Sequence, residues 1–172
     1  MSVEMFLKLA GCDGESIAVG HPGEIELLGW NWGVSNQGSS SMGGGSGTGK
    51  ASFHDLSITK YVDKATATIL SNCAKGSHFT TGILTCRKVG GGAPLKYLVI
   101  NLEQVFVSSV QHSGSPGDEL TVESVTFNFA KVDVTYQPQG DKGTAAGSVP
   151  FKWDIRANKS ALASGSLPRL AG

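Results

Sequence analysis

Two long apolar stretches of this chain change hydrophobic phase midway, and this feature constrains the fold more than any other. In residues 25–35 the apolar side chains move from odd to even positions: Ile25 and Leu27, then Leu28, Trp30, Trp32 and Val34. Side chains alternate between the two faces of a β-strand, so the buried face can change only at a bulge or corner. We expect such a corner near residues 27–29.

The second stretch, residues 120–136, shows the same change of phase. Its apolar side chains again move from odd to even positions: Val125, Phe127 and Phe129, then Ala130, Val132, Val134 and Tyr136. The second corner is therefore expected at residues 129–130. Two strands that each bend round a corner favour a small closed or nearly closed β-barrel, with a flat β-sandwich as the alternative.

Shorter β-like segments and one helix complete the predicted domain. Further strands are expected at 3–9, 53–61, 80–89, 95–108 and 149–155. The helix is expected at residues 63–76, with Asp63 as its N-cap and Gly76 as a left-handed C-cap. Its apolar stripe consists of Ala65, Ile69, Leu70 and Cys73. The sequence thus predicts a mainly-β barrel with one flanking helix in a single domain, 1–156, and a loose tail, 157–172.

A glycine-rich run between residues 38 and 49, followed by Lys50, separates two β-like segments. Residues 37–50 are therefore expected to form a long, extended hairpin loop. The alternative is a phosphate-binding loop, because Gly44, Gly49 and Lys50 have the required spacing. Ala51, however, replaces the hydroxyl that would hold magnesium, and no helix is expected directly after it. A nucleotide-handling enzyme is the less favoured hypothesis.

Composition excludes several classes of partner. Lys and Arg number 14, as do Asp and Glu, so the formal net charge is zero and nothing favours nucleic acid or an anionic membrane. Charged residues are only 16% of the chain, and there are 24 glycines. This low charge suits a β-protein that buries surface against copies of itself.

Neither cysteines nor histidines predict a reactive or metal-binding site. Cys12, Cys73 and Cys86 are odd in number and far apart, so we expect three reduced and mostly buried thiols. The histidines lie in separate segments without a metal-ligand spacing. No catalytic residue, cofactor or metal is expected. Residues 1–4 lack the features of a signal peptide, and no apolar run is long enough to insert in a membrane, so synthesis in the cytoplasm is expected.

Trp30 and Trp32 are two residues apart, so both rings should lie on one strand face. We interpret them as core or interface anchors. Asn31 and Gly33 would then lie on the opposite face and could contact a partner. A monomeric β-barrel binding module, with an aromatic site at the two tryptophans, is a further alternative.

Several separate segments, in order, carry a resemblance to a known family. They are LGWNWG (28–33), SMGGG (41–45), DLSITKYVDK (55–64), RKVGG (87–91), YLVI (97–100), VSSV (107–110), FNFAKV (127–132), YQPQ (136–139) and WDIR (153–156). Together they resemble the haemolysin-coregulated protein (Hcp) family, the tube subunit of bacterial type VI secretion systems. The resemblance covers residues 1–156.

The resemblance implies a structural protein without enzymatic activity. It implies homohexameric rings that stack into a tube, which is exported to the medium or a target cell by type VI secretion together with effectors. The spike protein, contractile sheath and baseplate are the other implied partners. The hairpin loop would contact adjacent subunits and rings, through Gln37, Met42, Gly43, Gly44, Gly45 and Lys50. Asn31 and Gly33 become candidates for the lumen or for effector contact.

Overall fold

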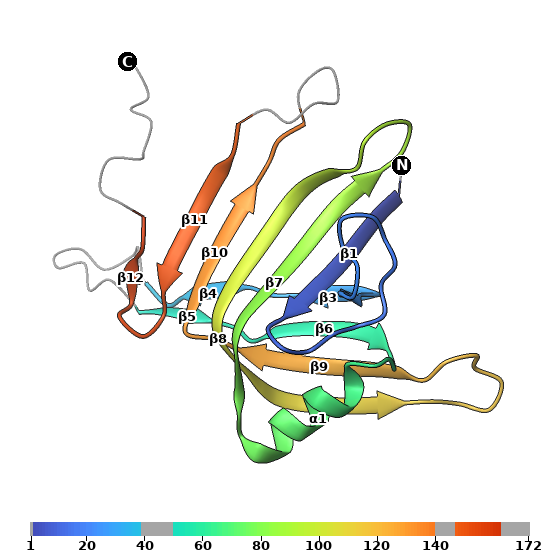
Figure 1. Ribbon diagram of the computed structural model, residues 1–172. Coiled ribbons are helices and arrows are strands. Elements are labelled where there is room, and N and C mark those ends of the chain that lie inside the picture. Colours follow the sequence, from blue (N-terminus) through green and yellow to red (C-terminus); the bar gives the residue numbers. More distant parts are fainter. Residues whose placement is uncertain (1, 39–49, 140–146, 163–172) are drawn as a thin grey trace, which may run out of the picture.

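The computed structural model describes residues 2–38, 50–139 and 147–162, and almost all of its elements are strands (Figure 1). The strands are β1 (Ser2–Leu9), β2 (Ile25–Glu26), β3 (Gly29–Asn31), β4 (Val34–Asn36), β5 (Ala51–Phe53), β6 (Leu56–Tyr61), β7 (His78–Val89), β8 (Leu95–Ser113), β9 (Val122–Asn128), β10 (Lys131–Tyr136), β11 (Val149–Asp154) and β12 (Lys159–Ser160). The helix is α1 (Thr66–Lys75). The predicted mainly-β class with one helix is confirmed.

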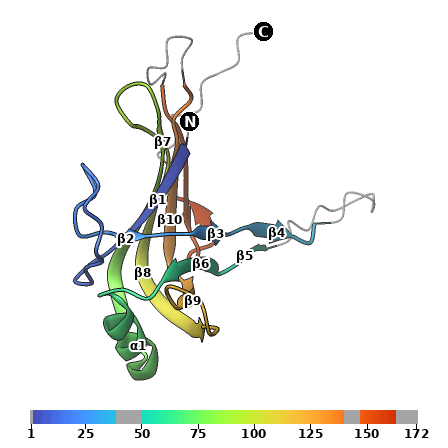
Figure 2. The ribbon, with the colours of Figure 1, turned by 90° about the vertical axis from the view of Figure 1, so that its right-hand side faces the viewer.

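The long strand β8 belongs to both halves of the main sheet. Its first part pairs with β7 and β10, and its last part pairs with β9, which continues to β6 and β3. Beyond β7 and β10 the sheet extends through β1 to β2 and through β11 to β12. All these pairings are antiparallel. The sheet therefore bends along β8 and folds its two halves over a common core (Figures 1 and 2).

Both predicted corners are present. The first lies between β2 and β3, where Leu27 donates its amide to Met5 while Leu28 donates to Thr59 on the other half of the sheet. The second separates β9 from β10 at residues 129–130. The ladders do not form a closed ring, so the barrel is an open one, and the predicted long strands are each divided into shorter elements at their corners.

The bend in β8 lies opposite the second corner. Glu103 pairs with β10 and Phe106 pairs with β9, which leaves two β8 residues facing residues 129–130. Gln104, the first of them, has a φ of 56°. A left-handed backbone at a non-glycine residue inserts a kink that a regular strand cannot make. β8 therefore bends at Gln104, opposite the corner between β9 and β10.

The core fills the angle between the two halves. Leu7, Leu84 and Ile100 are cross-strand neighbours on β1, β7 and β8 and are almost completely buried. Ile58 and Val125 are paired across β6 and β9 and are equally buried. Burial of each such side chain stabilises the fold by about 1.5–3 kcal/mol.

The helix is shorter at its start than the sequence predicts. α1 begins at Thr66, and Ala65 occupies the N-cap without a side-chain hydrogen bond. Asp63 instead accepts a hydrogen bond from the Ala65 amide, at 2.9 Å, in the turn before the helix. The predicted C-cap is confirmed, because Gly76 has a φ of 66° and its amide donates to Cys73.

A buried ionic network holds the start of the helix against the barrel. Lys60 and Glu123, on paired strands β6 and β9, are both fully buried and form an ion pair. The Lys60 ammonium also donates to Asp63 at 2.7 Å, and the Thr66 hydroxyl donates to Glu123 at 3.0 Å. His112 Nε2 lies 2.8 Å from the second Glu123 oxygen. Charges removed from water persist only when such partners compensate them.

The segment after residue 156 contains an element that the sequence does not predict. β12, a strand of two residues, pairs with the last residues of β11. It lies in the segment expected to be a loose tail, of which residues 163–172 fall outside the described part of the chain.

Candidate assembly surface

A two-stranded arm projects from one side of the barrel. β4 and β5 pair with each other as a separate sheet, with Val34 opposite Phe53 and Asn36 opposite Ala51, and they extend away from β3 (Figure 2). Ala51 starts a strand, and the helix begins only at Thr66. The glycine-rich run thus connects two strands, as the hairpin interpretation predicts, and lacks the strand-to-helix context of a phosphate-binding loop.

An aromatic cluster fixes the base of the arm. The ring centroid of Phe53, on β5, lies 6.1 Å from that of Trp32, 6.5 Å from that of Phe151 and 5.9 Å from that of Trp153. Trp32 also lies 6.1 Å from Phe129 at the second corner. Aromatic pairs at these separations are each worth about 0.5–1.5 kcal/mol beyond the area they bury. The direction of the arm is therefore set by packing against β11 and the corner.

The two tryptophans are half-buried and pack on the core. Trp30 lies opposite Ile58 and close to Cys86, and Trp32 joins the aromatic cluster. Asn31, between them, is exposed and pairs with Ser57 of β6. A Cβ atom at Gly33 would lie 3.3 Å from His54 Nδ1, and the Gly33 carbonyl accepts a hydrogen bond from the His54 amide. Gly33 therefore lies close to the His54 ring where the arm leaves the barrel.

The predicted contact residues of the hairpin loop lie at or beyond the end of the arm. Gln37 and Lys50 are exposed next to β4 and β5. Met42 and Gly43, Gly44 and Gly45 fall outside the described residues. The structure places the loop's two ends side by side through the pairing of β4 and β5.

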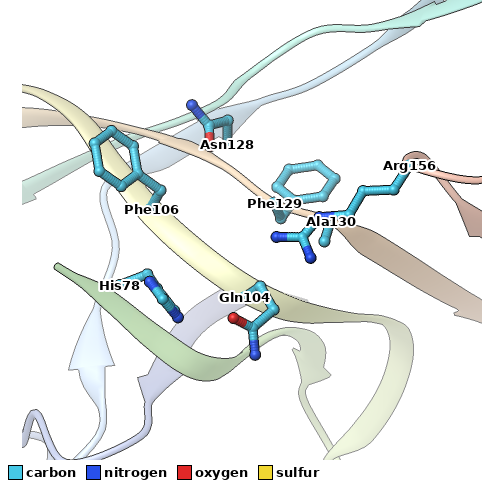
Figure 3. A pocket seen from close by; sticks show the side chains of 7 residues that line it. All are labelled: His78, Gln104, Phe106, Asn128, Phe129, Ala130 and Arg156. Carbon is cyan, nitrogen blue, oxygen red and sulfur yellow. The ribbon is translucent and has the colours of Figure 1, made fainter. Parts of the chain in front are cut away.

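A pocket of about 290 Å³ lies at the bend of β8 (Figure 3). Its lining consists of His78, Gln104, Phe106, Asn128, Phe129, Ala130 and Arg156. One imidazole and one guanidinium face two aromatic rings, and the lining contains no carboxylate, hydroxyl or thiol side chain. The lining offers no nucleophile paired with a base.

The cysteines are free, as predicted. Cys12 and Cys86 are buried and Cys73 is partly exposed. Burial raises the pKa of the Cys12 thiol to about 11, with the Asp63 carboxylate contributing, and burial also raises the pKa of Cys86. Such thiols are poor nucleophiles. Within residues 2–38, 50–139 and 147–162 no group of three or more His, Cys, Asp or Glu side chains could hold a metal ion.

Comparison with known proteins identifies the family. Residues 6–136 match the family model described as "Type VI secretion system effector, Hcp". The chain belongs to the Hcp family. Protein hcp1 of Pseudomonas aeruginosa is 46% identical over 162 residues, which are 94% of this chain and all of the relative.

Solved Hcp structures share the fold. Hcp1 from Salmonella typhimurium is 35% identical, with a TM-score of 0.77 over 93% of this chain and 99% of its own. A structure described as a type six secretion system protein is 32% identical, with a TM-score of 0.86 over 92% and 99%. In the described part of the chain, no helix has the length and apolar character needed to cross a membrane.

Sequence reasoning missed most of the aromatic cluster. Trp32, Phe151 and Trp153 all contact the Phe53 ring, yet only Trp32 was expected to serve as an anchor. Phe151 and Trp153 are two residues apart, the same spacing that pointed to Trp30 and Trp32. That spacing shows that two rings share a face, but not which distant strand covers them.

Proposed function

We propose that this chain is the tube subunit of a type VI secretion system, a structural protein and not an enzyme. It forms hexameric rings that stack into an exported tube, and the tube carries or chaperones effectors. The spike protein, contractile sheath and baseplate are its partners in the machine. Membership of the Hcp family supports this role.

The observation that carries the proposal is the arm with its rigid base. Few two-stranded hairpins are stable alone, because three or more strands or a packed face are usually needed. Here β5 is held against β11 and the second corner by aromatic contacts, so the arm projects in a fixed direction. A projecting element of this kind suits contact with the next subunit, and we propose Gln37–Lys50 as its contact segment, with Asn31 and Gly33 facing the lumen or an effector.

Electron microscopy of the purified full chain tests the function. We expect six-fold rings, and stacks of rings at high concentration. A chain that remains monomeric at high concentration and shows no rings would contradict the proposal.

The role of the arm is tested by replacing residues 39–49 with a short turn. Burial of the aromatic cluster should keep the barrel folded, with an unchanged circular dichroism spectrum, while ring or stack formation weakens. The matched control replaces residues 140–146, between β10 and β11, with a short turn. Tubes that form equally well without residues 39–49 would exclude this role.

A further inference from the structure

The loop between β1 and β2 exposes two aliphatic side chains almost completely. Ile17 is 94% exposed and Val19 is 89% exposed, the highest values among the large apolar residues that the structure describes. Ala18 lies between them and Gly20 follows, so residues 17–20 contain no polar side chain. We call these four residues the loop tip. Two neighbouring aliphatic side chains exposed to this extent mark a candidate contact surface.

Backbone hydrogen bonds fix the shape of this loop. The Gly14 amide donates to Gly23 at 2.8 Å, the Gly23 amide to Ser16 at 2.7 Å, and the Ser16 amide to Glu24 at 3.0 Å. A Cβ atom at Gly14 would lie 2.5 Å from the Glu24 carbonyl oxygen, so the two sides of the loop are in close contact. Backbone hydrogen bonds therefore join the two sides of the loop just below its tip.

Buried side chains attach the same loop to the sheet. His21, which is only 2% exposed, stacks on Phe6 at 4.4 Å and donates from Nδ1 to Glu24 at 2.8 Å. Arg87 on β7 donates to the Val19 carbonyl at 2.6 Å and to Glu4 at 2.7 Å. A loop that is already ordered loses little conformational entropy on binding, so its exposed side chains are pre-organised for a partner.

A second uncovered apolar surface lies on the opposite side of the sheet. Tyr136 and Val149 are cross-strand partners on β10 and β11 and are 48% and 61% exposed. Phe151 lies on the same face of β11 as Val149, and its ring contacts Phe53 of the arm. Val34, the cross-strand partner of Phe53, is also exposed. We call Tyr136, Val149, Phe151 and Val34 the inner patch. Its β10 and β11 side chains lie on the face of the sheet that, further along these strands, faces the core.

The two surfaces match in chemistry and lie back to back. Neither contains a charged residue, as is usual at the centre of a stable protein interface. Figure 2 shows the β1–β2 loop on one side of the sheet and the arm on the other. A contact between two different surfaces of the same chain repeats from copy to copy, and it makes a ring when the rotation closes.

We propose that the loop tip of one copy packs on the inner patch of the next copy in the ring. The proposal rests on the proposed tube function and adds to it by naming both sides of the ring contact. The partner is a second copy of this chain, because the chain itself carries both complementary surfaces. Ile17 and Val19 are the central residues of the proposed contact, since they are the most exposed large apolar residues of the described chain.

Substitution tests the loop tip. Ile17→Ser with Val19→Ser should leave a folded monomer and weaken ring formation about a hundredfold or more, measured by sedimentation and by counting rings in micrographs. The matched control is Leu70→Ser on α1, also an exposed aliphatic residue, which should form rings like the unaltered chain. Hydrogen bonds that hold the loop come from its backbone and from His21 and Arg87, so the double variant should keep its circular dichroism spectrum.

Crosslinking tests the pairing of the two surfaces. Ile17→Cys and Val149→Cys are combined with Cys73→Ser, which leaves Cys12 and Cys86 buried, and rings are treated with a short bis-maleimide. The pair should give a ladder that ends at the copy number of one ring, while each single-cysteine variant should give monomer. A ladder that continues beyond one ring would overturn the assignment to the ring contact.

The outcomes separate this inference from the function on which it rests. Rings that survive Ile17→Ser with Val19→Ser, or that give no ladder with the cysteine pair, overturn the inference alone. An unaltered chain that forms no rings contradicts the tube function and the inference together.

Discussion

Lys60 carries a charge that the fold removes completely from water. It follows Leu56 and Ile58 on the buried phase of β6, and it is itself 0% exposed. Its partner Glu123 is 63 positions away on β9, a separation that no local pattern encodes. An alternation pattern predicts which face is buried, but a buried charge depends on a partner that only the folded chain supplies.

Removing the Lys60 ammonium should therefore be costly. Lys60→Met leaves the Glu123 carboxylate buried without the Lys60 ammonium, and we expect the free energy of unfolding to fall by about 3–5 kcal/mol. Urea denaturation measures this value. Lys131→Met is the matched control, because its pair with Glu103 is about half exposed and should contribute less than about 1 kcal/mol. Equal losses in the two variants would contradict this account of the network.

Cys12 should give the protein a loss of stability at alkaline pH. Its pKa is raised from 9.0 to about 11, mainly by burial, so the folded state favours the neutral thiol. That contribution is complete below pH 9 and is lost as the pH rises through about 11. It amounts to about 2–3 kcal/mol at most. Urea denaturation between pH 8 and pH 11 should show a shallower decline for Cys12→Ala; an equally steep decline would exclude Cys12 as a cause.

At the scale of elements, the corners were predictable and the exact strand lengths were not. A change of hydrophobic phase is a local signal, and it correctly located the breaks between β2 and β3 and between β9 and β10. β12 and the start of α1 involve distant partners, β11 for the first and Glu123, which accepts a hydrogen bond from Thr66, for the second. The arm was expected as a hairpin, but its attachment to β11 through Phe151 and Trp153 required the three-dimensional structure.

The kink of β8 at Gln104 makes a prediction about backbone strain. A non-glycine residue at a φ of 56° is strained, and a β-branched residue there is strained most. Gln104→Val should therefore be less stable than Gln104→Gly by about 1–3 kcal/mol in urea denaturation. Glu103, the preceding residue in the same strand, provides the control. At position 103 the order should reverse, so that Glu103→Val is more stable than Glu103→Gly, because a regular strand favours valine over glycine. The same order at both positions would contradict the role of the kink.

On the scale of the whole molecule, low charge and two opposed apolar surfaces point to assembly driven by the hydrophobic effect. The formal net charge is zero, so neither long-range repulsion nor attraction between copies is expected. The loop tip and the inner patch add no charge to the proposed ring contact. The family and its fold could be inferred from the sequence, whereas the proposed pairing of these surfaces could not, because no local pattern relates the loop tip to Tyr136, Val149 and Phe151.

Salt should consequently have little effect on ring formation. Screening shortens the range of charge–charge interactions from about 10 Å at 0.1 M to about 3 Å at 1 M salt, and it leaves apolar burial intact. We expect rings of the full chain to persist at high sodium chloride and to strengthen in sulfate, which favours burial of apolar surface. Sedimentation and ring counts across this range measure the effect. Rings that dissociate in sodium chloride would show that ion pairs, and not the loop tip on the inner patch, hold neighbouring copies together.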